Sequence, residues 1–484
     1  RRFQNDFPGP LTHMMSLFEF YPQLRLFRDA LKGVDRRVFL VGGALRDYRL
    51  GRSCSDFDFA VDKDAIALAR KLARRLKGAF VLLDQEHGAA RIVKNQDGSV
   101  WTFDLSDWRG KSIQQDLQLR DFTVNALAWD MKAAGEEVIL ELKDSGRDIR
   151  AGVVRMAGPE VFKDDPLRLL RAFSLSASLG FKIEGRTLLH IKKEAALISN
   201  VAAERIREEI FKILASPRAH DALAAMDKIG LLPKVIPQIT VMYKVHQGGY
   251  HHLDVWRHSL EALRRLEKII DAMCADGRVK PYLQEIIGGG HTRASLLKLA
   301  ILLHDIGKPE TRSREKGRTS FHGHEHVGEY ICRQVSKQLK VAVKERYFLE
   351  DAVRLHLRPG YLANFKRPSE KAVFRYLRDT GGEAVSLAIL AMADQAATRG
   401  PLTTQARHKH HAKICRMLID RYFELKNQKP RERLLSGHDL IKVLKLKPSP
   451  IFGKILTEVE EAHALGKIKT RVEALALARK ISKG

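Results

Sequence analysis

A short segment of strict alternation, Asp56–Val61, limits most strongly how this chain can fold. The even-numbered positions are Asp56, Asp58 and Ala60, and the odd-numbered positions are Phe57, Phe59 and Val61. A repeat of two residues is typical of a half-buried β-strand, because successive side chains point to opposite faces. We therefore predict a strand that buries an aromatic face and presents two carboxylates on the other face.

A glycine turn precedes this strand. The segment Leu40–Asp47 reads LVGGALRD, so the apolar run Val38–Val41 is predicted to end in Gly42-Gly43 and to lead into a short helix. Glycine lets the backbone approach a phosphate closely, and a helix N-terminus offers unpaired N–H groups. Gly42 and Gly43 are thus candidate phosphate-binding residues, and Arg46 could reach a triphosphate as a forked donor.

Two carboxylates on one strand face can share divalent metal ions. One metal would lower the pKa of an attacking hydroxyl, and the other would neutralise a pyrophosphate leaving group. With the glycine turn, Asp56 and Asp58 resemble the signature of the polymerase-β-type nucleotidyltransferase superfamily, in its tRNA nucleotidyltransferase and bacterial poly(A) polymerase branch. The resemblance implies that both residues bind Mg²⁺ and are catalytic. Asp104, in the predicted strand Val100–Leu105, is a candidate third carboxylate unless it only ends its strand.

A second motif lies in Asp116–Ala128, which reads DLQLRDFTVNALA. It resembles the family motif with an Arg-Asp-Phe-Thr core, whose Arg and Asp bind the nucleotide sugar and phosphates. The resemblance places Arg120 and Asp121 in those roles, although the family often has a second arginine where this chain has Leu119. The alternative is an ordinary capping pair ahead of a helix.

A third motif lies in Lys163–Phe181, which reads KDDPLRLLRAFSLSASLGF. It resembles the Glu-Asp-x-x-Arg motif that reads the incoming base in this family. Asp165 and Arg168 are three residues apart, so both could project from one helix face, and together they match the pairing edges of cytosine and adenine. Arg171, one turn further, could reach the phosphates. Asp165 ahead of Pro166 is also a good helix cap, and both interpretations can hold.

A second group of candidate residues lies further along the chain: His258, His304, Asp305 and Asp394. Imidazole and carboxylate groups suit hard to borderline divalent metals. The pattern resembles the four ligand positions of the HD phosphohydrolase superfamily, which implies a metal site that activates water to hydrolyse a phosphomonoester or cyclic phosphodiester. The ion could be Mg²⁺, Mn²⁺ or Ni²⁺, and the imidazoles favour a transition metal.

Three more histidines crowd the segment FHGHEH. His324 matches a Gly-His-Glu position of related nucleotidyltransferases that carry an HD domain. His322 and His326 are interpreted as surface residues.

The net charge is +27, from 85 Lys+Arg against 58 Asp+Glu. An excess of this size favours a polyanionic partner, nucleic acid before a membrane surface. No apolar run approaches the roughly 18 residues of a membrane span, and Arg1–His13 shows no signal-peptide core. The four cysteines form no CxxC pair, so we expect free thiols in a cytoplasmic protein.

Strand signals fade after about residue 146, and the rest reads as helices with loops such as Arg312–Arg318. We therefore predict an α+β nucleotidyltransferase head, with a small mixed sheet and helices, followed by an all-α neck, an HD-type helical body and a basic tail. The expected parts are a lead-in (1–33), head (34–145), neck (146–220), body (221–420) and tail (421–484).

The function that the resemblance implies is addition of C and A to tRNA 3′ ends from CTP and ATP. One alternative is a poly(A) polymerase acting on other RNA 3′ ends, but the Arg-Phe-rich segment of that branch is missing from His87–Val93. The short stretch between Asp104 and Asp116 leaves CC-only or A-only addition open, since a longer loop there accompanies full CCA addition in many members. An alternative of another class is an HD phosphohydrolase or RNA-binding scaffold with an inactive head.

Overall fold

The computed structural model describes residues 15–96, 98–133, 138–315, 318–428 and 432–482. The segment Arg1–His13, for which no signal-peptide core was expected, lies outside these ranges. The chain divides by its internal contacts into an N-terminal unit, Arg1–Val235, and a C-terminal unit, Ile236–Gly484, and each is described by itself. Among the described residues, no helix combines the length and apolarity needed to cross a membrane.

The N-terminal unit begins with a seven-stranded sheet in the order β3-β4-β5-β2-β1-β6-β7. Its strands are β1 (Val38–Val41), β2 (Asp56–Val61), β3 (Ala79–Asp84), β4 (Ala89–Gln96), β5 (Ser99–Asp107), β6 (Leu127–Asp130) and β7 (Ile139–Glu141). The pair β2–β5 is parallel and the other neighbouring pairs are antiparallel. The predicted mixed sheet is confirmed, and β2 has the predicted bounds.

The aromatic face of β2 is buried against helices that precede the sheet in sequence. Phe57 and Phe59 are each 1% exposed, whereas Asp56 and Asp58 are open to solvent. The lead-in forms α1 (Leu17–Phe20) and α2 (Gln23–Ala30), and Phe27 of α2 stacks on Phe59 with ring centroids 3.9 Å apart. The lead-in is therefore part of the hydrophobic core of the head. The remaining head helices are α3 (Gly43–Arg49), α4 (Ala65–Leu76) and α5 (Ile113–Gln118).

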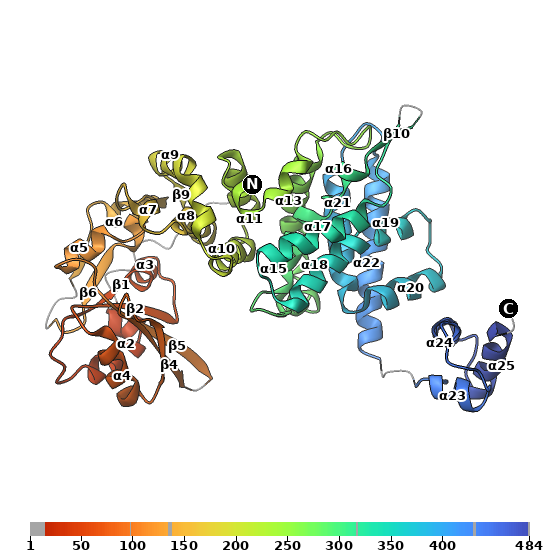
Figure 1. Ribbon diagram of the computed structural model, residues 1–484, viewed down its shortest axis with the longest axis horizontal. Helices are drawn as coiled ribbons and strands as arrows, with labels where there is room; N and C mark the ends of the chain where they lie inside the picture. The colour runs from red at the N-terminus through yellow and green to blue at the C-terminus, as the bar shows by residue number, and fades with distance from the viewer. Residues whose placement is uncertain (1–14, 97, 134–137, 316–317, 429–431, 483–484) are drawn as a thin grey trace. The chain divides into compact units, whose positions relative to one another are not determined.

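The rest of the N-terminal unit is mainly helical, as predicted (Figure 1). Its helices are α6 (Ser145–Ala151), α7 (Val161–Asp164), α8 (Arg168–Leu179), α9 (Gly185–Glu194), α10 (Ala203–Ala215), α11 (Ala219–Lys228) and α12 (Leu232–Val235). The two short strands β8 (Val153–Val154) and β9 (Lys182–Ile183) pair in parallel and join α6 to the end of α8. The predicted neck boundary at residue 220 falls inside α11.

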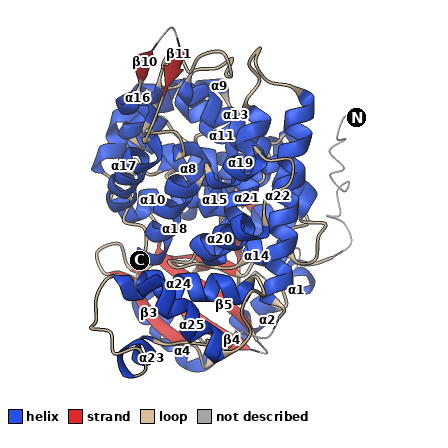
Figure 2. Cartoon of the chain, turned by 90° about the vertical axis from the view of Figure 1, so that its right-hand side faces the viewer, coloured by secondary structure: helices blue, strands red, loops and turns tan. Residues whose placement is uncertain are grey.

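The described residues of the C-terminal unit are helical except for one hairpin and the connecting loops (Figure 2). Its first ten helices are α13 (Val255–Met273), α14 (Val279–Gln284), α15 (Arg293–Leu303), α16 (Lys308–Thr311), α17 (His324–Gln338), α18 (Val343–Leu355), α19 (Arg358–Ala363), α20 (Glu370–Thr380), α21 (Ala384–Ala397) and α22 (Gln405–Lys426). Helices α15 and α21 are apolar on nearly every face because other helices surround them. The prediction of a loop over Arg312–Arg318 is wrong in part, since β10 (Ser313–Glu315) and β11 (Arg318–Ser320) form an antiparallel hairpin there.

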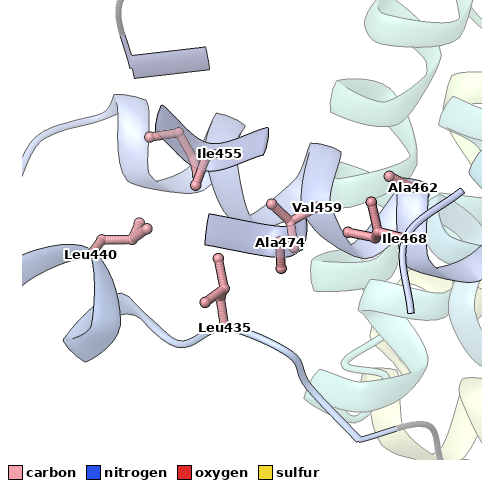
Figure 3. Close-up of a cluster of buried hydrophobic side chains, with 8 residues drawn as sticks. Leu435, Leu440, Ile455, Val459, Ala462, Ile468 and Ala474 are labelled. Carbon is pink, nitrogen blue, oxygen red and sulfur yellow. The ribbon is translucent and has the colours of Figure 1, made fainter. Parts of the chain in front are cut away.

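The chain ends in three helices with a hydrophobic cluster of their own. They are α23 (Gly437–Lys442), α24 (Ile451–Ala464) and α25 (Arg471–Ser482). Figure 3 shows Leu440, Ile455 and Val459 among the buried side chains of this cluster. The predicted start of the tail at residue 421 falls inside α22, which runs to Lys426.

Candidate active site and metal centre

Three carboxylates meet on one face of the head sheet. Asp56 and Asp58 lie on β2, and Asp104 lies on β5 directly beside Asp58 in the parallel register. Arg91 of β4 forks onto Asp104, with Nε 2.7 Å from Oδ1 and Nη2 2.8 Å from Oδ2. Asp56 accepts a hydrogen bond from the Thr102 hydroxyl. The oxygen-only ligand set of Asp56 and Asp58 fits a hard divalent ion such as Mg²⁺.

The electrostatics of Asp58 also favour a bound cation. Burial raises the pKa of Asp58, and Asp104 raises it further, whereas Arg120 opposes both effects. The side chain remains open to solvent although protein surrounds it. A cation bound here would restore the charged form of the carboxylate.

The glycine turn lies against these carboxylates. Gly42 has φ of +77°, and a β-carbon added to it would lie 3.5 Å from both Asp58 Oδ2 and Arg120 Nη1. Only glycine adopts this backbone region without strain, so the turn can pass close to the site. The Gly42 N–H donates to the carbonyl of Leu127 and is not available to a phosphate.

Arg46 is engaged within the protein. Its guanidinium is bound to the Asp47 carboxylate at 2.9 and 3.0 Å, and its Nη1 donates to Asn125 Oδ1 at 2.6 Å. Asn125 in turn donates to Asp121 at 3.1 Å. The expected free fork toward a triphosphate is therefore not what the structure shows, because Arg46 here orients Asn125 and, through it, Asp121.

The second motif places Arg120 close to Asp58 and buries Asp121. Arg120 donates through Nε to Asp116 Oδ2 at 2.9 Å, which holds its guanidinium near Gly42. Asp121 is 7% exposed and pairs with Arg171 Nε at 3.0 Å. Burial acts to raise the pKa of Asp121, but Arg171 and the hydrogen bond from Asn125 outweigh burial and lower it.

The third motif differs from its predicted geometry. Asp165 has extended backbone angles and precedes α8, which begins at Arg168, so the prediction that both project from one helix face is wrong. The residue before a proline is disfavoured in helical geometry, and Pro166 accounts for the shift. Asp165 Oδ1 accepts from the Leu167 N–H, and its Oδ2 pairs with Arg205 of α10 at 2.9 Å.

Arg168 is 5% exposed and makes backbone contacts. It donates to the carbonyl of Val161 at 3.2 Å and to that of Leu119 at 3.1 Å. These bonds connect α8 to α7 and to the segment just before Arg120. The guanidinium of Arg205, on α10, lies beside Asp165 and is half exposed.

The four predicted HD residues converge in the C-terminal unit. His258 Nε2 lies 2.9 Å from Asp394 Oδ1, and His304 Nε2 lies 3.2 Å from Asp305 Oδ2. One ligand atom each from His258, His304 and Asp305 lie within 4.8 Å of one another. His304 Nε2 has no hydrogen bond of good geometry among the described residues and faces the carboxylates of Asp305 and Asp394 at 3.2 and 3.7 Å, where a bound metal ion would replace a proton on the ring.

A second trio shares Asp305 with the first. Ligand atoms of Asp305, His324 and His356 also lie within 4.8 Å of one another. His356, which follows α18, was not among the predicted ligands. Lys308 was not predicted at this site either, and its Nζ donates to Asp305 Oδ2 at 2.6 Å. His322 and His326 are exposed and lie outside the cluster.

Backbone contacts fix the orientation of three histidine rings. Nδ1 of His304, His324 and His356 lies 2.6 to 2.8 Å from the carbonyl three residues upstream. A ring that donates through Nδ1 has its lone pair on Nε2. The Nε2 atoms of His324 and His356 are 3.3 Å apart, and burial lowers the pKa of His356 to about 3. Two facing Nε2 atoms, with the His356 ring resistant to protonation, favour a metal ion at this position.

Comparison with known proteins agrees with this division of sites. Residues 38–155 match the family model of the poly(A) polymerase head domain, and residues 251–425 match the HD domain. Residues 180–242 match a model described as a probable RNA- and SrmB-binding site of polymerase A.

Similar proteins span almost the whole chain. A CC-adding tRNA nucleotidyltransferase of Thermus thermophilus is 32% identical, over 91% of this chain and 92% of that protein. An A-adding tRNA nucleotidyltransferase of Deinococcus radiodurans is 31% identical, over 91% of this chain and 94% of that protein. A solved tRNA-processing enzyme in an apo form has a TM-score of 0.61 at 21% identity, over 90% of this chain and 97% of that chain, which shows a common fold.

Proposed function

The chain belongs to the tRNA nucleotidyltransferase and poly(A) polymerase family, and on that premise we propose that it adds C, A or both to tRNA 3′ ends from CTP and ATP. The observation that carries this proposal is the meeting of Asp56, Asp58 and Asp104 beneath the Gly42 turn, with Arg120 at the edge. Relatives named for CC addition and for A addition are almost equally similar to the chain.

Asp56 and Asp58 would hold Mg²⁺. The bound metal would lower the pKa of the RNA 3′-hydroxyl and neutralise the departing pyrophosphate. Arg91 orients Asp104 beside Asp58 through two hydrogen bonds. Arg120, held by Asp116, faces the same space and would bind the triphosphate. Asp121 is buried and pairs with the half-exposed Arg171, and together they would orient the nucleotide sugar.

Base selection would involve Asp165 together with Arg205. Asp165 can accept from the exocyclic amino group that cytosine and adenine share, and Arg205 lies 2.9 Å from it with its guanidinium half exposed. Arg168 positions this region by holding the carbonyls of Val161 and Leu119. Arg168 could contact a base only after breaking its hydrogen bonds to these two carbonyls.

The number of nucleotides added depends on the connection between β5 and α5. It spans only residues 108–112 and is pinned, since the N–H of Arg109 donates to Asp116 at 2.9 Å and that of Lys111 to Gln115 at 2.7 Å. A short, pinned connection favours partial addition, either CC or the terminal A. The test supplies tRNAs ending before CCA, after C, or after CC with CTP and ATP separately. A long A tail would instead favour the poly(A) alternative.

The HD cluster supports a second candidate function. We propose that it binds divalent metal, one ion at each of the two ligand trios that share Asp305, and hydrolyses a phosphomonoester or cyclic phosphodiester. Its four imidazoles favour Mn²⁺ or Ni²⁺ over Mg²⁺. Hydrolysis of 2′,3′-cyclic AMP and of p-nitrophenyl phosphate with each metal tests this proposal.

We further propose the four-part division into head, neck, body and tail, with tail lysines and arginines contacting RNA phosphates. A cytoplasmic location is proposed on the basis of the relatives, and the free state of all four cysteines agrees with it.

A further inference from the structure

A basic groove of about 1200 Å³ lies on the C-terminal unit, away from the HD cluster's ligands. One wall is α22, and the other is the loop over residues 364–369 that joins α19 to α20. Figure 1 shows α22 as a long helix beside α19 and α20. The groove is lined by one aromatic residue, Phe365, and by the basic residues Lys366, Arg367, Lys409, Lys413 and Arg416, among others.

The groove carries positive charge that the protein does not neutralise. Its three acidic residues are already paired, Glu370 and Glu424 with Arg421 and Asp420 with Arg278. The five cations Lys366, Arg367, Lys409, Lys413 and Arg416 have no acidic partner within ion-pair distance in the described part of the chain. Five unneutralised charges in one groove indicate a polyanionic ligand.

The spacing of these charges suits a chain of phosphates. Lys409, Lys413 and Arg416 follow one another at i, i+4 and i+7 on one face of α22. Their positions rise by about 6 Å and then about 4.5 Å along the helix. Side chains of this length can follow successive phosphates of one strand, while Lys366 and Arg367 approach from the opposite wall.

An aromatic ring stands beside the charges. Phe365 is 61% exposed, and its ring makes no aromatic contact among the described residues. The loop that carries it is anchored, because His410 Nε2 lies 2.9 Å from the Phe365 carbonyl and the Phe365 N–H donates to Leu362. An anchored, exposed ring next to cations provides a stacking surface for an unpaired base.

We propose that this groove binds an unpaired stretch of RNA, with Lys409, Lys413 and Arg416 on its phosphates and Phe365 stacked on a base. The proposal rests on the proposed function, since the RNA would be the tRNA substrate. The 3′ end must lie at Asp56 and Asp58 in the N-terminal unit, so the groove would hold another unpaired segment of the same molecule, such as a loop. A duplex would offer phosphates but no free base face to Phe365.

Binding of labelled RNA to the full-length protein tests the proposal. The probes are a single-stranded oligoribonucleotide of about 12 nucleotides without self-complementarity and a blunt RNA duplex of equal length. Replacing Lys409, Lys413 and Arg416 by alanine should weaken single-strand binding and reduce the slope of log affinity against log salt by about 2, from roughly 0.7 per lost phosphate contact. The matched control replaces Lys268, Lys337 and Lys344, which are exposed lysines of the same unit outside the groove, and should leave the slope unchanged.

The aromatic contact separates this proposal from plain charge attraction. Phe365→Ala should weaken single-strand binding about 5-fold or more and leave duplex binding unchanged, whereas Phe365→Trp should retain single-strand binding. Equal loss in the control triple variant, or no effect of Phe365→Ala, would overturn the proposal. Wild-type protein that passes these tests but labels no tRNA would refute only the proposed function. Protein that labels tRNA but binds single strands equally well after Phe365→Ala would refute only the groove.

Discussion

Asp58 on β2 and Asp104 on β5 lie directly side by side in a parallel register, and their charges are balanced in different ways. Asp104 is neutralised by the fork of Arg91, whereas Asp58 has a raised pKa and has Arg120 as its strongest opposing charge. The protein therefore satisfies one carboxylate internally and leaves the other, with Asp56, open to an external cation. Asp104 therefore differs from Asp56 and Asp58 in having its charge balanced by an arginine of the protein.

Replacing Asp56 by alanine should lower nucleotide incorporation at least about 100-fold, because several kcal/mol of transition-state charge stabilisation would be lost. Hydrolysis at the HD cluster should be retained, since it uses residues of the other unit. Asp29→Ala removes an exposed carboxylate of the same head and serves as the control. Loss of both activities in Asp56→Ala would contradict two separate sites.

The role of Arg168 can be separated from that of Asp165. Arg168→Ala leaves two backbone carbonyls without their donor, so the free energy of unfolding should fall by about 1–3 kcal/mol. Asp165→Asn should leave stability nearly unchanged and reduce the preference for CTP and ATP over UTP and GTP. Thermal unfolding and single-nucleotide incorporation measure the two effects. An Arg168→Ala protein of wild-type stability would show that Arg168 is not a positioning residue.

The two ligand trios predict a metal stoichiometry. His356→Ala should reduce the bound transition metal to about half of the wild-type content, because it removes a ligand from only one trio. His304→Ala should reduce metal binding and HD hydrolysis yet spare nucleotide incorporation. Elemental analysis of purified protein gives the ratio. Unchanged metal content in His356→Ala would restrict the site to the four residues predicted from sequence.

Glu261 should contribute stability that depends on pH. Burial acts to raise its pKa, but hydrogen bonds from Arg264 and Arg265 outweigh burial and lower the pKa from 4.5 to about 2. A lowered pKa in the folded state stabilises the protein above pH 4.5, and this contribution is lost as the pH falls toward 2. Glu261→Gln should therefore destabilise the protein at pH 7 and progressively less near pH 3, as measured by urea unfolding. A difference that does not change with pH would argue against this ion pair.

Local patterns allowed the head to be predicted well. The alternation of Asp56–Val61 fixes both a strand and its buried face, because each step depends only on neighbouring residues. The extended backbone of Asp165 also follows from sequence, since Pro166 disfavours helix at the residue before it, whereas the three-residue spacing to Arg168 suggests a shared helix face. Arg46 could not be assigned from sequence, because Asn125, its partner, lies far along the chain.

The HD cluster shows the limit of sequence patterns more clearly. His258, His304, Asp305 and Asp394 follow from a known ligand order, but His356 and Lys308 enter only through the packing of α18 against α15 and of α16 against α17. No periodicity marks a histidine that follows a helix as a ligand. The fixed Nδ1 contacts that turn three Nε2 atoms inward are a property of the folded backbone.

Incorporation of labelled CMP and AMP into tRNA that lacks its 3′ end tests the central claim most directly. Wild-type protein with Mg²⁺, CTP and ATP should extend this tRNA, or the tRNA ending in CC, by C, A or both and then stop. No incorporation into any tRNA ending before, within or after CC would contradict the assignment of Asp56 and Asp58 to an active nucleotidyltransferase site.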